Sequence, residues 1–157
     1  MSAFPFIPAQ AYVKTFDTGE VVQCGGILVS NPTDLATVRL LLYYHGTPGG
    51  SENLRAKIYT DAGYTQLLAN SDWSSLAAIS NPSTDWWGWF SLNFSTTLPL
   101  GTDSQYYVAI ETQNYTRGAS DVFYLAASYD WPVPQNTNVS AAGHYALAMQ
   151  VYGYRGP

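Results

Sequence analysis

The sequence predicts an all-β protein, an antiparallel β-sandwich of about eight strands. Three observations support this fold class. Apolar and polar side chains alternate with period two in several short stretches, as they do along a half-buried strand. Clusters of Gly, Pro, Asn and Asp separate these stretches, as expected for turns. No stretch has the spacing of an amphipathic helix, and no repeat of fixed length indicates a propeller or a solenoid.

The two clearest strands lie at 86–94 and 105–112, after the middle of the chain. Each has one face of large apolar side chains and an opposite face of mixed character, which is typical of strands that cover a core. The residues expected to share the core-facing sides are Phe90, Leu92 and Phe94 in the first strand and Tyr106, Val108 and Ile110 in the second. The stretch 98–104 contains Pro, Gly and Asp and is expected to form the loop between them.

The other expected strands are shorter or less regular. Residues 35–45 form the longest one, and because both of its faces are largely apolar it is expected at the centre of a sheet. Gly25 and Gly26 indicate either a β-bulge or a close backbone approach in the expected strand at 21–30. The stretch 66–79 is predicted either as short strands or as one irregular helical turn. The expected strands are Tyr12–Phe16, Val21–Ser30, Leu35–His45, Leu54–Tyr59, Val122–Tyr129 and Tyr145–Gly153.

The length of 157 residues fits one domain. Residues 1–11 are apolar and contain two prolines, so they are expected to form an extended N-terminal arm, with the sandwich domain at 12–157. The arm carries Phe4, Phe6 and Ile7, which have to be buried on a protein surface. That surface is either the arm's own domain or a neighbouring subunit, and the sequence leaves both open.

Composition excludes several classes of partner. The formal charge is −5 and the six basic residues are scattered, which argues against nucleic acid. No run is long and apolar enough to cross a membrane, and the residues after Met1 do not resemble a signal peptide. Cys24 is the only cysteine and is expected to be a buried, inert thiol. No cofactor and no metal site are expected.

Candidate catalytic residues are few. His45 and His144 are far apart in sequence and belong to no nucleophile or zinc motif. Most acidic residues lie in predicted turns, where Asp commonly bonds the backbone. Glu111 is the exception because it lies on a predicted strand. One carboxylate without a visible partner does not make a glycosidase site, which needs two, so the protein is expected not to be an enzyme.

The aromatic residues are the best candidates for a binding site. The chain has five Trp and 13 Tyr, and only 11% of its residues are charged. Three readings stay open for the tryptophans around residues 86–89 and for Trp131: coverage by the chain itself, contact with a protein partner, or stacking of a glycan on exposed rings. The candidate contact or glycan platform consists of Trp86, Trp87, Trp89 and Trp131.

The second half of the chain resembles jelly-roll β-sandwich modules. In such modules a Trp-x-Phe-x-Phe strand precedes a Leu-x-x-Gly-x-x-Tyr-x-Val-x-Ile segment, and a Val-Tyr-Gly strand closes the domain. The stretches that carry the resemblance are Trp89-Phe90-Ser91-Leu92-Asn93-Phe94, Leu100-Gly101, Tyr106-Tyr107-Val108-Ala109-Ile110 and Leu147-Ala148-Met149-Gln150-Val151-Tyr152-Gly153. Modules of this kind occur in bacteriophage particle proteins and in carbohydrate-binding modules, so the resemblance implies a jelly-roll-like sandwich but carries over no functional residue.

These observations lead to two expected functions. The first is a non-enzymatic virion structural protein, a bacteriophage capsid decoration (cement) protein made in the host cytoplasm without a signal peptide. Its expected partners are itself, as a homo-oligomer for which a trimer around a capsid threefold is one form, and a major capsid protein. The arm residues Phe4, Phe6 and Ile7 would form its interface. The alternative is a carbohydrate-binding, host-recognition module of a phage tail or a secreted protein, with a glycan as partner.

Overall fold

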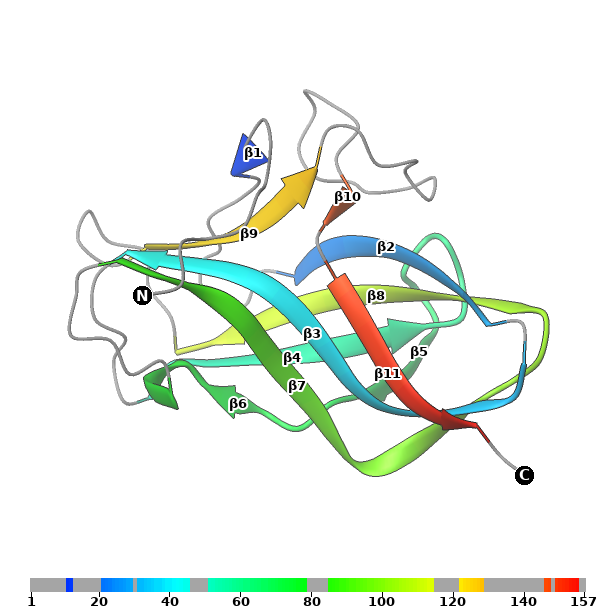
Figure 1. The fold of residues 1–157 in the computed structure, drawn as a ribbon. Helices are drawn as coiled ribbons and strands as arrows, with labels where there is room; N and C mark the ends of the chain where they lie inside the picture. The colour runs from blue at the N-terminus through cyan, green and yellow to red at the C-terminus, as the bar shows by residue number, and fades with distance from the viewer. Residues whose placement is uncertain are drawn as a thin grey trace.

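The computed structural model describes residues 11–12, 21–29, 31–45, 51–78, 85–114, 122–128, 146–147 and 149–155. Within these ranges the protein is all-β, with two antiparallel sheets that form a sandwich (Figure 1). The predicted fold class is therefore confirmed. The arm residues Phe4, Phe6 and Ile7 lie outside the described residues, as does Trp131.

The strands follow the predicted order closely. One short 3-10 helix, η1 (Leu76–Ala78), is the only helical element in the described part of the chain, in which no helix is long and apolar enough to cross a membrane. The strands are β1 (Ala11–Tyr12), β2 (Val21–Val29), β3 (Thr33–His45), β4 (Asn53–Tyr59), β5 (Leu67–Asn70), β6 (Ser74–Ser75), β7 (Asp85–Leu100), β8 (Ser104–Gln113), β9 (Val122–Ser128), β10 (Ala146–Leu147) and β11 (Met149–Arg155).

The strand pairs are nested about the middle of the chain. β4 pairs with β5, β3 with β7, β2 with β8, and β1 with β9, each time antiparallel. The chain is thus paired like one long hairpin that is rolled into two sheets, of order β1-β9-β3-β7 and β2-β8-β4-β5. This nested pairing is the jelly-roll arrangement, and in Figure 1 β3, β7 and β11 cross in front of the second sheet.

β3 is the central strand of the first sheet. It pairs with β7 along one edge, while β11 and β9 pair in turn with residues 33–40 and 42–45 along the other. Because β3 is covered along both edges and on its inner face, most of its side chains are apolar, which accounts for the nearly continuous apolar run of residues 35–45. The sequence-based prediction of a central strand here is confirmed.

The core lies between the sheets and is built from alternating residues. Phe90, Leu92 and Phe94 of β7 are buried, as predicted from their period-two spacing. Tyr106, Val108 and Ile110 of β8 belong to the same cluster, also as predicted. The other strands add Leu35, Val38, Leu40, Leu42 and Tyr44 from β3 and Leu54, Ala56 and Ile58 from β4.

Two local predictions need correction or completion. The stretch 98–104 is not a loop throughout, because β7 extends to Leu100 and only residues 101–103 separate it from β8. Pro99 is tolerated within β7 because that strand lies at the edge of its sheet, where one row of backbone groups has no ladder partner. Residues 66–79, for which two readings were open, contain both short strands and a helical turn, namely β5, β6 and η1.

Register shifts adjust which side chains face outward. The bulge predicted at Gly25 and Gly26 is confirmed by a shift between Gln23 and Gly25 in the β2–β8 ladder. A second shift occurs in β11 between Tyr152 and Gly153, across from β3. A side chain at Gly153 would collide with Thr33 Cγ2 and would lie 2.8 Å from the Asp34 carbonyl oxygen. The close approach of β11 to β3 at this point therefore requires glycine.

The free edge of β7 is partly covered by the segment that precedes η1. The backbone N–H of Asp72 donates to the Asn93 carbonyl at 2.9 Å, and Ser74 Oγ donates to the Ser91 carbonyl at 3.2 Å. Ser95 Oγ bonds the Asp72 carboxylate at 3.0 Å. These bonds join the two sheets at one side of the sandwich and satisfy edge groups that would otherwise be open to another chain.

A candidate binding face on the first sheet

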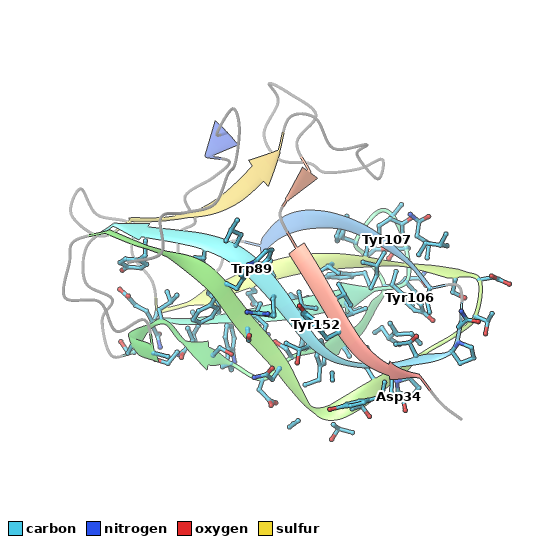
Figure 2. All side chains as sticks on the ribbon, in the orientation of Figure 1. Asp34, Trp89, Tyr106, Tyr107 and Tyr152 are labelled. Atoms are coloured by element: carbon cyan, nitrogen blue, oxygen red, sulfur yellow. The ribbon has the colours of Figure 1, made fainter. Side chains whose placement is uncertain are left out.

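The outer face of the first sheet carries an arginine between two aromatic rings. In the ladder between β3 and β7, Arg39 lies opposite Ser91, and Trp89 is the next outward residue along β7. In the ladder between β3 and β11, Tyr152 lies opposite Thr37, which is the next outward residue along β3. Trp89 and Tyr152 are therefore the diagonal neighbours of Arg39 on its two sides, at a separation that long side chains can span. Trp89 and Tyr152 are labelled in Figure 2.

The guanidinium of Arg39 contacts both rings. Its Cζ lies 5.7 Å from the centroid of the Trp89 ring and 5.8 Å from that of Tyr152, within the range of cation–π attraction. Its Nη1 lies 3.5 Å from the Tyr152 hydroxyl, which is a long hydrogen bond. Its Nε is buried and has no hydrogen-bond partner. Arg39 forms no ion pair with any residue that the structure describes.

The rings on this face remain accessible. Trp89 is 36% exposed and Tyr152 46% exposed, and Tyr154, two residues further along β11, is 68% exposed. Leu41 of β3 lies directly opposite Trp89 and is nearly buried. The other neighbouring outward residues of β3 and β7 are small and neutral: Thr37, which donates from Oγ1 to the Asn93 side-chain oxygen at 2.9 Å, and Ser91. We call Arg39, Trp89 and Tyr152 with their neighbours Thr37, Ser91 and Asn93 the open face.

A second arginine–tryptophan pair lies on the outer face of the other sheet. Arg55 Cζ is 4.3 Å from the centroid of the Trp73 ring. Arg55 Nε donates to the Glu111 carboxylate at 2.7 Å, and Lys57 Nζ donates to the same oxygen at 3.2 Å. Arg55 and Glu111 are directly opposite each other in the β4–β8 ladder, and Lys57 is opposite the next outward residue, Ala109. We call Arg55, Lys57, Trp73 and Glu111 the closed cluster.

The charges of the closed cluster satisfy one another. Burial disfavours the charged form of Glu111, but the hydrogen bonds and positive charges of Arg55 and Lys57 outweigh it and hold the pKa of this carboxyl below its ordinary value. The side chains of Arg55 and Lys57 are only 23% and 13% exposed. Glu111, the one strand carboxylate noted in the sequence, thus has two structural partners, both on β4.

Aromatic residues also cover part of this second outer face. Tyr64 makes edge-to-face contacts with Tyr59 and Tyr107, at ring centroid distances of 5.4 and 5.7 Å. The three rings bury Ala109 between the strands in a small separate cluster. Burial and the nearby Glu111 charge raise the pKa of Tyr59. The outward rings of this sheet are therefore largely covered by the chain itself.

The structure places the predicted platform only in part. Trp89 faces outward, opposite the buried Phe90, as its spacing predicts. Trp86 and Trp87 pair with Tyr44 and Tyr43 of β3, and their side chains, like all of Trp131, are outside the described part of the structure. The platform as a set of four tryptophans stays a prediction.

Sequence reasoning did not assign Arg39 and Tyr152 to any site. The available signal for Arg39 was its position as the only charged residue in the apolar run 35–45 other than the terminal histidine. Nothing in the sequence places Tyr152 beside it, since the two residues are 113 positions apart. The sequence matches no family model and no curated protein, so the function is argued from this geometry.

Proposed function

We propose that this protein is a non-enzymatic structural protein of a virus particle, a bacteriophage capsid decoration protein that acts through contacts between subunits. The observation that carries the proposal is the open face, where Trp, Tyr and Arg lie together on the surface. These three residue types are the ones enriched at the energetic centres of protein interfaces. Jelly-roll sandwiches also serve as capsid domains, although that support is an analogy of fold.

The core between the sheets is complete without the aromatic residues of the open face. The cluster between the sheets is closed by fully buried residues such as Leu42, Leu92 and Ile110, and Trp89 lies outside it. The accessible parts of Trp89, Tyr152 and Tyr154 are apolar surface that a second molecule would bury in this proposal. Such burial contributes about 25 cal/mol per Å² of apolar surface, less the cost of association.

In this proposal the partners are further copies of the chain and a major capsid protein. The open face packs against one neighbour, and the arm with Phe4, Phe6 and Ile7 lies along another. A trimer around a capsid threefold is one arrangement that uses both surfaces. Ordering the arm on binding costs conformational entropy, so the open face has to supply the central part of the interface.

The test compares two variants in sedimentation equilibrium and in co-sedimentation with particles of the virus that encodes the chain. Trp89→Ala and deletion of residues 1–10 are each expected to reduce self-association and particle binding at least about tenfold. Leu28→Ser is the matched control, because Leu28 is 76% exposed but lies on β2 of the other sheet. A wild-type chain that stays monomeric at high concentration and does not bind particles contradicts the proposal.

A second candidate is a carbohydrate-recognition module, and one observation favours it. Leu41 lies directly opposite Trp89 on the open face, and further along the two strands Ser91, Thr37 and Asn93 offer hydroxyl and amide groups. An exposed indole bordered by neutral hydrogen-bonding groups suits a sugar ring, whose faces are apolar and whose edges are hydroxyls. Binding of any oligosaccharide that is lost in Trp89→Ala supports this candidate.

A further inference from the structure

We propose that the open face binds an acidic sugar, a pyranose that carries a carboxylate, with Arg39 taking the carboxylate and Trp89 the ring. The inference rests on the second candidate function, carbohydrate recognition, in which the open face binds a ligand instead of a neighbouring subunit. It adds the chemical class of the ligand and a role for Arg39 and Tyr152.

The charge of Arg39 is the first argument. The guanidinium is a half-buried cation without a carboxylate partner among the described residues. The nearest acidic residue along β3 is Asp34, five positions away, which corresponds to about 16 Å along a strand. This exceeds the Debye length of about 8 Å at physiological salt, so Asp34 does not neutralise Arg39. Asp72 is a second acidic residue near this face, at the edge of β7 beside Asn93, and its carboxylate accepts from Ser95 rather than forming an ion pair with Arg39.

The donors of Arg39 are the second argument. A guanidinium has five N–H donors, and a half-buried one is stabilised when acceptors meet them. Here Nε is enclosed without an acceptor, and the one bond from Nη1 is 3.5 Å long. The Nη groups are the donors that a ligand can still engage. A carboxylate matches their planar geometry and forms charge-assisted hydrogen bonds that are about twice as strong as neutral ones.

The position of the rings is the third argument. Trp89 and Tyr152 flank Arg39 on the same face and keep the guanidinium in place through cation–π contacts at 5.7 and 5.8 Å. A sugar ring that stacks on the exposed part of Trp89 has its substituents within reach of Arg39. The hydroxyl and amide groups of Thr37, Ser91 and Asn93 lie on the same face and can bond its hydroxyls. Stacking and ion pairing thus act on one ligand.

The closed cluster shows what this chemistry looks like when the chain itself supplies the anion. There, Arg55 stacks on Trp73, and the Glu111 carboxylate accepts a hydrogen bond from its guanidinium at 2.7 Å. On the open face the cation and the rings are present, and no residue in the described part of the chain supplies a carboxylate to Arg39. Glu111 accepts from Nε of Arg55, whereas a ligand carboxylate would bind the Nη groups of Arg39, because Nε of Arg39 is enclosed. The two sites share a stacked guanidinium that calls for a carboxylate, and this analogy favours an acidic sugar over a neutral one.

The test measures binding of the full chain to three acidic oligosaccharides and to their methyl esters by isothermal titration calorimetry. The probes are oligogalacturonate, oligomannuronate and sialyllactose, and each ester removes the charge while keeping the sugar. At least one acid is expected to bind, with an ester at least about tenfold weaker. Arg39→Met is expected to weaken the acid to the level of its ester, and Trp89→Ala to abolish binding of both forms. Arg55→Met is the matched control and is expected to leave both affinities unchanged.

The outcomes separate this inference from the function on which it rests. Equal binding of acid and ester, with loss in Trp89→Ala, overturns the acidic preference and leaves carbohydrate recognition standing. Absence of binding to every acid overturns the inference, and the same result with the esters and with neutral oligosaccharides overturns carbohydrate recognition too. Loss of acid binding in Arg55→Met but not in Arg39→Met overturns the location. Thermal melts of each variant confirm that it is folded.

Discussion

An arginine stacks on a tryptophan on the outer face of each sheet, and the two pairs differ in one component. Arg55 on Trp73 is completed by Glu111 at 2.7 Å, with Lys57 on the same carboxylate. Arg39 on Trp89 has a second ring, Tyr152, and no carboxylate among the described residues. The first pair is satisfied within the chain, whereas the second leaves donors and aromatic surface for another molecule.

Residues of the same kind thus form a fully paired cluster on one sheet and an incompletely satisfied one on the other. A half-buried cation that is paired and hydrogen-bonded belongs to the fold, and removal of its partner is costly. In the proposed acidic-sugar site, the unsatisfied donors of Arg39 serve a ligand and contribute little to the fold. Each of the following variants tests one side of this contrast.

The largest effect is expected for Gly153→Ala, which tests whether the open face depends on the seating of β11. A Cβ at Gly153 would collide with Thr33 Cγ2 and approach the Asp34 carbonyl oxygen to 2.8 Å, so β11 has to shift away from β3. We expect a loss of about 2–3 kcal/mol in the free energy of unfolding, as for overpacked sites. Urea denaturation followed by tryptophan fluorescence measures it.

Gly101→Ala is the control for Gly153→Ala, because a Cβ at Gly101 meets only the hydroxyls of Tyr106 and Ser104, at 3.4 and 3.5 Å. Amide hydrogen exchange in Gly153→Ala is expected to show a larger loss of protection in β3 and β11 than in β4 and β8. Equal loss of protection in both sheets contradicts the independence of the open face from the closed cluster.

The next largest effect is expected for Glu111→Gln in the closed cluster. The substitution leaves Arg55 and Lys57 without their shared carboxylate, and both cations are largely buried. We expect the free energy of unfolding to fall by about 2 kcal/mol at neutral pH. Asp103→Asn is the control, since it removes an exposed carboxylate at a turn position with φ of 52°, which Asn tolerates.

Glu111→Gln is also expected to change how the free energy of unfolding depends on pH. The pKa of Glu111 in the folded chain lies below its ordinary value of 4.5, so the unfolded chain binds this proton more readily. The stabilisation is therefore complete above pH 4.5 and is lost as the pH falls through the lower, folded pKa. Urea midpoints from about pH 3 to about pH 7 are expected to be flatter in Glu111→Gln; parallel profiles contradict the assignment.

The smallest effects are expected for the matched pair Arg55→Met and Arg39→Met, which keep the aliphatic stem and remove the charge. Arg55→Met breaks the bond to Glu111 and is expected to cost about 1 kcal/mol. Arg39→Met removes an unpartnered Nε and is expected to change stability by less than about 0.5 kcal/mol. The reverse order in denaturant midpoints would show that Arg39 is the structural arginine.

Much of the fold could be predicted from the sequence because strand faces are a local property. The alternation at Phe90, Leu92 and Phe94 determines which side is buried, and burial of all three confirms it. The length and apolar character of residues 35–45 likewise indicate a central strand. The turn glycines and prolines separate the strands, except at Pro99, where an edge position overrides the expected break.

The two arginine sites could not be predicted, because each joins residues that are distant along the chain. Glu111 meets Arg55 across 56 positions, and Tyr152 meets Arg39 across 113. Alternation tells which way each side chain points, but the strand order and the register of each ladder decide which outward side chains become neighbours. The register depends on bulges such as the one at Gly153, where β11 packs against β3. The sequence therefore determines which side chains each strand presents on its outer face. The tertiary structure decides that Arg55 meets a carboxylate and that Arg39 meets two aromatic rings.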